Sequence, residues 1–287
     1  MTQPDLTGLA SHLTRPSINT GCSRRRREVI TGMNLDHPNI TTVSGITEGK
    51  EFGGIVTPWC QNGYAFRYLG KHKLSRSKRY RLWLGVAEGL VYLHTHKLQI
   101  VHGDMKPPNV LIADHGRPMI CDLVLSNPSS LLARDGYSSD ESWSWTPQIN
   151  TTRAHSGTPR YLAPGRVDLT DPSKLTVAAN VYSLGCIRLE VGYVWSIAHL
   201  LPITLSKPSP QPPGKIFHDI RQGVPSAARL ATAYSTGSSS VNGIALLWDI
   251  FERCWSRDPS LRPTASRLRD LLVAHESVIV SALERQA

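Results

Sequence analysis

The chain has 287 residues, which suits one two-lobed domain or two small ones, and 40% of them are apolar, which is enough for a packed core and argues against wholesale disorder. No apolar run approaches the ~20 residues that a membrane-spanning helix needs, and residues 1–20 lack the apolar core of a secretory signal. The formal charge of +10 includes basic runs at 24–27 and 71–81, but neither has the aromatic pattern of a single-strand binder, so nucleic-acid binding is not expected.

The N-terminal part of the sequence predicts little regular structure. Residues 1–23 are polar without sustained periodicity and are expected to form a loose N-terminal segment. Residues 28–35 are expected to be the last turns of a helix, closed by the turn formers at 36–39. A short strand is predicted at 54–57, and a connector follows it at 58–63.

Residues 75–94 form the clearest helical pattern in the chain. Four apolar residues recur there at helical spacing: Leu82, Val86, Leu90 and Leu93. We expect this face to pack on a core. Short apolar runs bounded by turn formers then predict three strands: 98–101, 110–112 and 118–121.

The second half of the chain predicts helices joined by long loops. Residues 126–158 are rich in Ser, Thr, Asn and Asp, and residues 202–214 hold five prolines, so both are expected to be loops. Helices are predicted at 177–194, 241–254 and 263–275. No regular alternation of strands and helices occurs, which argues against a parallel doubly wound sheet.

The strongest functional motif is the segment 101–109, V-H-G-D-M-K-P-P-N. It resembles the catalytic loop of protein kinases, H-R-D-L-x-x-x-x-N, with Gly103 in place of the arginine. The resemblance implies that Asp104 accepts the proton of an attacking hydroxyl and that Lys106 reaches the transferring phosphoryl group. It also implies that Asn109 turns back to hold a metal ion, together with Asp122 after the next strand. A carboxylate after an apolar strand suits Mg²⁺.

Further segments resemble the same family in the family's order. Residues 55–60 look like the fifth strand and hinge, which implies that Thr57 is the gatekeeper and that Trp59 and Cys60 face the adenine of ATP. Glu28 precedes the segment 35–40 and looks like the glutamate that forms an ion pair from the helix of the family's small lobe. Three more blocks look like the end of an activation segment, the central helix of the large lobe and the last conserved block: 157–164, 180–186 and 248–263.

The resemblance implies an α+β, protein-kinase-like fold with a mainly helical C-lobe. The expected organisation is a loose segment at 1–23, a remnant of the N-lobe at 24–57, a C-lobe at 58–278 and a tail at 279–287. The activation segment is expected at 122–165. The N-lobe is expected to be truncated, because no glycine-rich loop precedes Glu28 and residues 1–23 contain no lysine to pair with it.

Several positions depart from the family pattern. Val124 replaces the glycine after the metal-binding Asp, Gly165 replaces the glutamate of A-P-E, and Asn180 replaces an aspartate that accepts backbone N–H groups. Because its usual partner is missing at Gly165, Arg262 is expected to be a surface or capping residue.

The sequence leaves three functional interpretations open. The first is a serine/threonine-type protein kinase that uses ATP and Mg²⁺ to phosphorylate a protein substrate. The second is a catalytically inactive pseudokinase that serves as a scaffold for partner proteins. The third is that the sequence is a truncated gene model whose full product carries the missing strands.

The cysteines indicate the compartment. The five cysteines are scattered without C-x-x-C spacing, which indicates reduced thiols and no zinc site. His94 and His96 are expected to be ordinary polar residues at a helix end. A soluble, intracellular and cytoplasmic protein with no membrane span is therefore expected, and the sequence carries no signal for its oligomeric state.

Overall fold

Helices dominate the part of the chain that the computed structural model describes, which comprises residues 32–47, 54–123, 127–128, 161–166, 176–193 and 239–285. The helices are α2 Ala65–Lys71, α3 Arg76–Thr95, α5 Val177–Tyr193, α7 Ser239–Cys254, α8 Ala265–Ala274 and α9 Glu276–Glu284. Short 3-10 turns lie at η2 Pro107–Asn109, η5 Pro164–Arg166 and η8 Pro259–Leu261.

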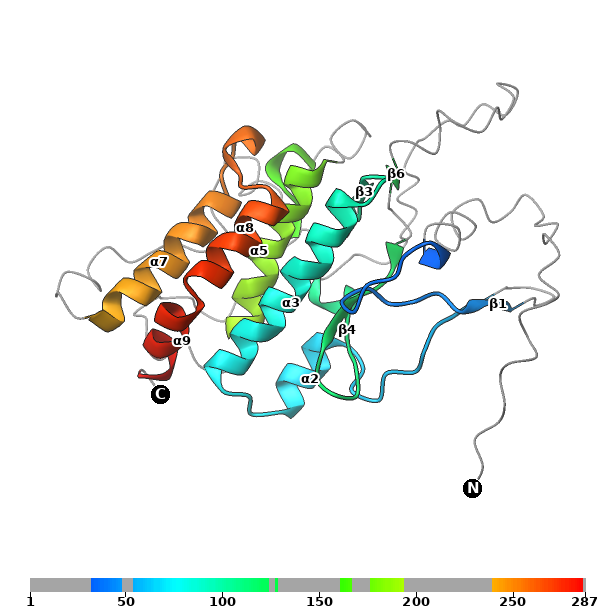
Figure 1. The fold of residues 1–287 in the computed structure, drawn as a ribbon, viewed down its shortest axis with the longest axis horizontal. Coiled ribbons are helices and arrows are strands. Elements are labelled where there is room, and N and C mark those ends of the chain that lie inside the picture. Colours follow the sequence, from blue (N-terminus) through cyan, green and yellow to red (C-terminus); the bar gives the residue numbers. More distant parts are fainter. Residues whose placement is uncertain are drawn as a thin grey trace, which may run out of the picture.

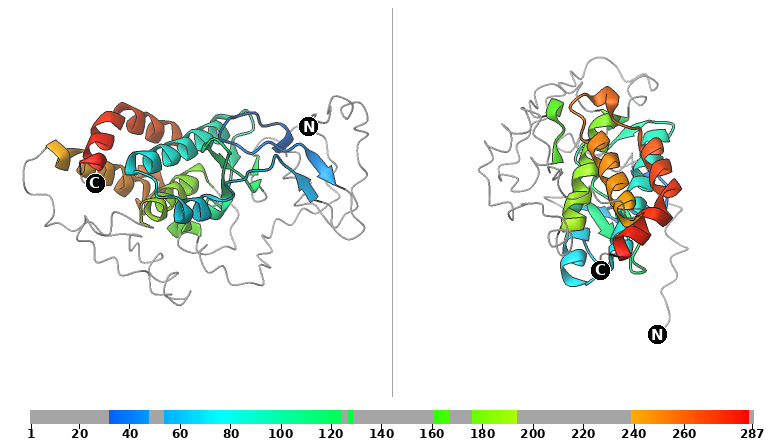
Figure 2. Two further views of the ribbon diagram at one scale, coloured as in Figure 1. Left: turned by 90° about the horizontal axis from the view of Figure 1, so that it is seen from below. Right: turned by 90° about the vertical axis from the view of Figure 1, so that its left-hand side faces the viewer.

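The strands are short and form antiparallel pairs. The pairs are β1 Gly45–Thr47 with β2 Gly54–Val56, β3 Ile100–Val101 with β6 Asn127–Pro128, and β4 Val110–Ile112 with β5 Pro118–Ile120. The β1–β2 pair stands apart from the helices, whereas β4 and β5 lie against them (Figures 1 and 2). The chain therefore has a helical body with a small strand region at one end.

Helix α3 is the centre of the helical body. It packs against α5, α8, α9 and strand β5 (Figure 1). The helix begins at Ser75, whose side chain accepts a hydrogen bond from Lys78 N–H, as an N-cap residue does. The prediction of a helix at 75–94 is confirmed, but its buried face differs slightly from the expected one. Leu82 is only partly buried, while Trp83 is fully buried.

Aromatic side chains fill the core between α3, α5 and α7. The Trp83 ring meets Phe251 edge to face at 5.3 Å between centroids, and Phe251 stacks on Trp255 at 5.6 Å. Trp83 also donates its Nε1–H to the backbone oxygen of Leu184 at 3.1 Å, so the largest buried side chain leaves no polar atom unpaired. These contacts fix α5 against α3, which matters because Asn180 of α5 is bonded both to the loop at Gly103 and to His94 of α3.

Most predicted elements are confirmed: the strands near 54–57, 98–101, 110–112 and 118–121, and the helices near 177–194, 241–254 and 263–275. The expected tail at 279–287 needs correction. Helix α9 covers most of it and packs on α7, because Ile279, Ala282 and Leu283 are buried. Helix α2 and strand β1 were not predicted.

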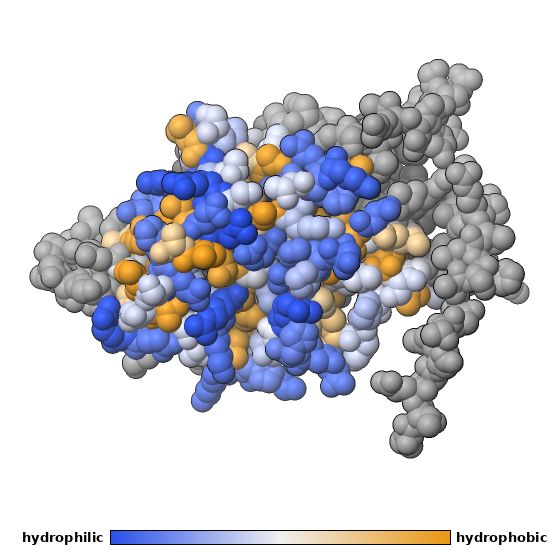
Figure 3. All heavy atoms as spheres, in the orientation of Figure 1, coloured by the Kyte–Doolittle hydropathy of each residue, from blue (hydrophilic) through white to orange (hydrophobic). Residues whose placement is uncertain are grey.

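The surface shown in Figure 3 is largely hydrophilic. Hydrophobic residues occur there in small separate groups among polar ones, as is normal for a side that faces solvent. In the described ranges, no helix combines the length and the apolar character that crossing a bilayer requires.

Replacing Gly185 of α5 with alanine should destabilise the domain. An added Cβ would lie 2.7 Å from Trp255 Nε1 and 2.9 Å from Cys254 Cβ, so the packed neighbours would have to shift. Overpacking of this kind costs about 1–3 kcal/mol, which should lower the urea midpoint of unfolding. Gly70→Ala is the matched control, because nothing lies within 4 Å of its added Cβ. Equal midpoints for the two variants would contradict the described packing of α5 on α7.

Candidate functional site

The candidate site is built on the loop between β3 and β4. Met105 in this loop is buried and anchors it in the core, while the side chains of Asp104 and Lys106 stay partly open to solvent. Gly103 has a φ of 80°, a left-handed conformation that glycine adopts without strain. Turn η2 then ends at Asn109, whose N–H donates to Lys106 O at 2.9 Å. The turn therefore brings Asn109 back toward Asp104 and Lys106.

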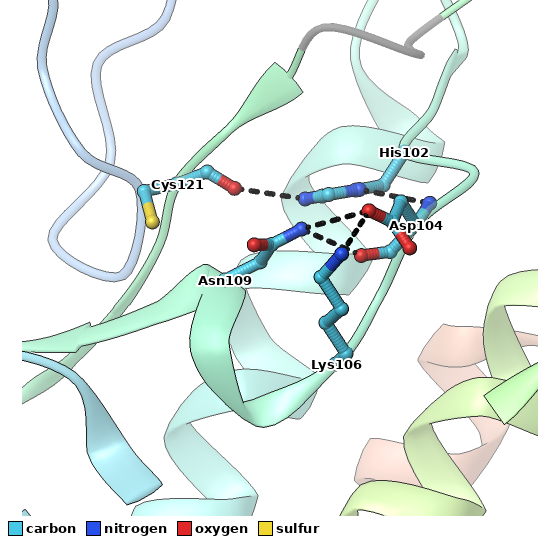
Figure 4. Close-up of polar contacts among 5 residues, drawn as sticks. All are labelled: His102, Asp104, Lys106, Asn109 and Cys121. Carbon is cyan, nitrogen blue, oxygen red and sulfur yellow. Dashed lines mark hydrogen bonds and ion pairs between the residues drawn. The ribbon is translucent and has the colours of Figure 1, made fainter. Parts of the chain in front are cut away.

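Asp104, Lys106 and Asn109 are in direct contact (Figure 4). Lys106 Nζ lies 2.6 Å from Asp104 Oδ2. Asn109 Nδ2 donates to the backbone oxygen of Asp104 at 2.8 Å and to its Oδ2 at 3.3 Å. No described residue donates a hydrogen bond to Asp104 Oδ1. The structure thus brings together the three residues predicted as catalytic and leaves one carboxylate oxygen open.

His102 ties this loop to the end of β5. Its buried ring accepts a hydrogen bond at Nδ1 from Asp104 N–H (3.3 Å), so Nε2 carries the proton and donates to Cys121 O (2.9 Å; Figure 4). Burial lowers the pKa of His102, and this effect outweighs the hydrogen bond to Cys121 O and the carboxylates of Asp104 and Asp122, which raise it. The ring therefore joins two parts of the site without adding a buried charge.

Asp122 follows the same end of strand β5. Cys121 N–H donates to Asn109 O at 3.0 Å, so Asp122 follows directly after the point where β5 and Asn109 are joined. Its φ of 61° lies in the left-handed region, which is strained for a residue with a side chain. The charges of Asp122 and Asp104 both act on the His102 ring. Both carboxylates therefore lie near this ring and not on opposite sides of the molecule.

The oxygen atoms at this site suit Mg²⁺. This ion takes oxygen ligands, usually one or two protein carboxylates with phosphate oxygens and water. Because Asn109 Nδ2 is turned toward Asp104, its Oδ1 is the atom left for a cation, and Asp122 supplies a carboxylate after the strand end that is joined to Asn109. In the described part of the chain, no group of three or more His, Cys, Asp or Glu residues could hold a metal by itself. A cation here would need further oxygen atoms, such as those of a bound phosphate group.

Asn180 of α5 joins the loop to the end of α3. Its Oδ1 accepts from Gly103 N–H at 3.0 Å, so its amide nitrogen must be the group that meets His94 Nε2 at 3.1 Å. His94 Nε2 is therefore an acceptor, and the imidazole is neutral with its proton on Nδ1. Burial, together with the neighbouring His102, lowers the pKa of His94 to about 4. Sequence reasoning missed His94, because its partner is far away along the chain.

The residues predicted to face adenine lie on the segment after β2. Thr57 and Trp59 are exposed, Trp59 by 85%, whereas Cys60 is buried. The segment is fixed to the site by β4, since Ile112 N–H donates to Gly63 O at 2.8 Å. Glu28 lies outside the described residues, as do Val124 and the segment 157–160.

Arg262 was predicted to be a surface or capping residue; it is buried, so the surface alternative is wrong, whereas its bonds to backbone oxygens fit the capping alternative. The guanidinium donates to three backbone oxygens, those of Ser256, Ala178 and Arg257, and it lies over the Tyr182 ring at 5.2 Å. The carbonyl oxygens take the role that a glutamate has in the family pattern. The sequence could not predict these acceptors, because every residue has a backbone carbonyl group whatever its side chain.

Arg166 is a second charged residue that the sequence did not point to. It ends η5, only 9% of its surface is exposed, and the charge of Asp104 acts on it. The segment is anchored on α5, because Ser183 Oγ donates to Tyr161 O at 2.6 Å. The structure therefore adds a cation to the neighbourhood of Asp104.

Comparisons with known proteins agree with this arrangement. Residues 13–272 match the family described as the protein kinase domain. The chain is 29% identical to Serine/threonine-protein kinase CTR1 of Arabidopsis thaliana, covering 86% of this chain and 26% of that protein. It is 26% identical to Receptor protein-tyrosine kinase CEPR1 of Arabidopsis thaliana, with 86% of this chain and 24% of that protein covered.

A fungal relative gives a similar result. MAP kinase kinase kinase win1 of Schizosaccharomyces pombe is 26% identical, covering 62% of this chain and 13% of that protein. The chain thus spans about a quarter or less of the length of these relatives.

The stability of the domain should fall as the pH drops below about 6.5, in part because of His94. The folded pKa of about 4 lies below the ordinary 6.5, so between these values the unfolded chain binds the proton more readily and stability is lost as pH falls. This group alone should remove about 2 kcal/mol between pH 7 and pH 5. Urea unfolding at both pH values measures the loss.

His94→Gln should show a smaller pH dependence than the parent chain, whatever its stability at pH 7. His115→Gln, which changes an exposed histidine, is the matched control and should keep the parent dependence. The buried neutral state of His94 would be refuted by identical pH dependences for His94→Gln and the parent chain.

Proposed function

This chain belongs to the protein kinase family, and on that premise we propose that it transfers the γ-phosphoryl group of ATP to a serine or threonine hydroxyl of a protein. The observation that carries the proposal is the contact between Asp104, Lys106 and Asn109, with Asp122 at the adjoining strand end. Two acids, a lysine and an amide are the groups that phosphoryl transfer needs for proton acceptance, charge stabilisation and metal binding.

Asp104 is the proposed proton acceptor. Its Oδ2 is held by Lys106 and Asn109, which fixes the carboxylate, while Oδ1 is left to accept a hydrogen bond from the substrate hydroxyl. That bond orients the hydroxyl oxygen for attack on the γ-phosphorus. As the new P–O bond forms, the bond between the γ-phosphorus and the β–γ bridging oxygen breaks, ADP leaves, and the hydroxyl proton passes to Oδ1. Lys106 Nζ, which is paired with the same carboxylate, is proposed to stabilise the negative charge that develops on the transferring group.

Asn109 and Asp122 are the proposed ligands of Mg²⁺, through Asn109 Oδ1 and the Asp122 carboxylate. When bound, the ion would neutralise charge on the phosphates. On the adenine side, Thr57, Trp59 and Cys60 are proposed to contact the base. The backbone N–H and C=O of Trp59 form no hydrogen bond within the described part of the chain, so both could pair with the edge of the base.

A non-catalytic scaffold is the second candidate function. It is favoured by the way the family's charged contacts are replaced: Asn180 holds the loop without a charge, and Arg262 binds carbonyl groups where the family uses a glutamate. The fold could persist with these contacts even if no phosphate were transferred. The two candidates make opposite predictions for the following experiments.

Asp104→Ala should lower phosphate transfer by about 10²–10⁴, because general-base catalysis contributes that much. The measurement is incorporation of radiolabelled phosphate from ATP into serine- and threonine-containing peptides by the purified chain. Asp270→Asn is the control, since Asp270 is exposed and its one ion pair among the described residues is with Arg269 on the surface of α8. Transfer that is absent from the parent chain, or unchanged in Asp104→Ala, would reject the enzymatic proposal.

ATP with Mg²⁺ should raise the melting temperature of the parent chain. A ligand at a hundredfold excess over its Kd stabilises a protein by about 2.7 kcal/mol. Asp122→Asn should reduce the part of the shift that depends on Mg²⁺ and leave the part seen with ATP and EDTA. A scaffold without a nucleotide site predicts no shift at all, with or without the metal.

A further inference from the structure

The segment proposed to contact adenine, residues 57–60, is held at its two ends. Just before it, strand β2 is paired with β1. At its end, Gly63 N–H donates to Cys60 O at 3.0 Å and closes a turn at 60–63. Between these points the segment is exposed, including the Trp59 side chain. The position of its backbone therefore depends on strand β2 and on the contacts that hold the turn 60–63.

Two polar side chains hold this turn against the end of β4. Asp114 Oδ1 accepts a hydrogen bond from Gln61 N–H at 3.0 Å. Asn62 Nδ2 donates to Ala113 O at 2.7 Å and to Asp114 O at 3.3 Å. Each of the two segments thus supplies one side chain and receives the other. We call Asn62 and Asp114 together the polar clamp.

The charge of Asp114 also acts on the side chain of Cys60. Burial raises the pKa of the Cys60 thiol, and the Asp114 carboxylate raises it further. Such a thiol stays protonated and neutral at physiological pH. The carboxylate of the polar clamp therefore lies close to the buried end of the segment 57–60, and no second charge is placed there.

Strand β4 connects the polar clamp to the catalytic loop. Its three residues begin directly after Asn109 and end directly before Ala113. On the way, Ile112 N–H donates to Gly63 O at 2.8 Å. Helix α2, which follows the turn, packs beside the same strand (Figure 1). The polar clamp and the proposed metal ligand Asn109 are therefore fixed at opposite ends of one short element.

We propose that Asn62 and Asp114 are positioning residues for the adenine of ATP. The inference rests on the proposed function, because it takes the segment 57–60 to be the place where the base binds. The polar clamp fixes the backbone of Trp59 and Cys60 relative to β4, so the groups offered to the base are preorganised. Neither clamp residue has to touch the nucleotide. Loss of the clamp should weaken ATP binding and leave the transfer rate at saturating ATP unchanged.

The test measures binding of adenosine to the full 287-residue chain by calorimetry, and KM for ATP and kcat by radiolabelled transfer. Adenosine carries the base without the phosphates, so its affinity reports on the adenine side alone. Asp114→Ala should weaken adenosine binding about three- to tenfold, as the loss of one hydrogen bond does. It should raise KM for ATP by a similar factor, while kcat stays within about twofold of the parent value.

Exchanging carboxylate and amide at the two clamp positions should give opposite results. Asp114→Asn keeps an oxygen that can accept from Gln61 N–H, so it should bind adenosine nearly as well as the parent chain. Asn62→Asp removes the donor and sets a carboxylate against two carbonyl oxygens, so it should lose affinity at least as far as Asp114→Ala. His115→Ala truncates the exposed neighbour of Asp114 and is the matched control, which should keep the parent affinity. Melting temperatures show that each variant is folded.

Three results would overturn the inference. Equal adenosine affinities for Asp114→Ala, Asn62→Asp and the parent chain would show that the polar clamp does not position the base. A fall in kcat at an unchanged KM for ATP would place the role of Asp114 outside the adenine side. A parent chain that binds no adenosine would have no base to position. Because calorimetry needs no turnover, a chain that transfers no phosphate but loses adenosine affinity in both variants would refute the proposed transferase and support the polar clamp.

Discussion

The side-chain amide of Asn109 is the contact on which the geometry of the site depends. It donates to both the backbone and the carboxylate of Asp104, while its own backbone oxygen accepts from Cys121 at the end of β5. One nearly buried residue thus sets the distance between the loop and the strand that leads to Asp122. Because the amide has a donor side and an acceptor side, turning the nitrogen toward Asp104 necessarily presents the oxygen to the other side, where a cation could lie.

The charged and the neutral polar groups of the site are separated in space. On the core side, His94, His102 and Asn180 form hydrogen bonds without any formal charge, which avoids the large desolvation cost of buried ions. On the open side lie Asp104 and Lys106, both partly exposed. An aspartate in place of Asn180 would put a carboxylate against the neutral imidazole of His94 and would require that ring to become a donor. The asparagine and the neutral histidine are therefore mutually consistent.

Features that depend on a local sequence pattern were predicted well, whereas contacts between distant segments of the chain were not predicted. The spacing of Asp104, Lys106 and Asn109 could be seen in the sequence because a single loop carries all three. Helix α2 was missed because it has only seven residues, of which Ala65 and Leu69 alone are buried. Helix α9 was missed because His275 both ends α8 and begins α9, so no breaker residue marks the boundary. The pairing of Asn180 with His94 spans 86 positions, a separation that no periodicity records.

One feature of the site contradicts a local preference of the backbone. Asp122 has a φ of 61° although it is not glycine. Gly103 occupies a left-handed position without strain, and Gln99 is the other described residue with a side chain that has a positive φ. Strained or unsatisfied groups persist only where the surroundings hold them in place, and they gather at functional sites. Asp122 directly follows the strand end that Asn109 joins to the loop, so its strained backbone lies where a carboxylate would be needed to hold the metal ion of a bound nucleotide.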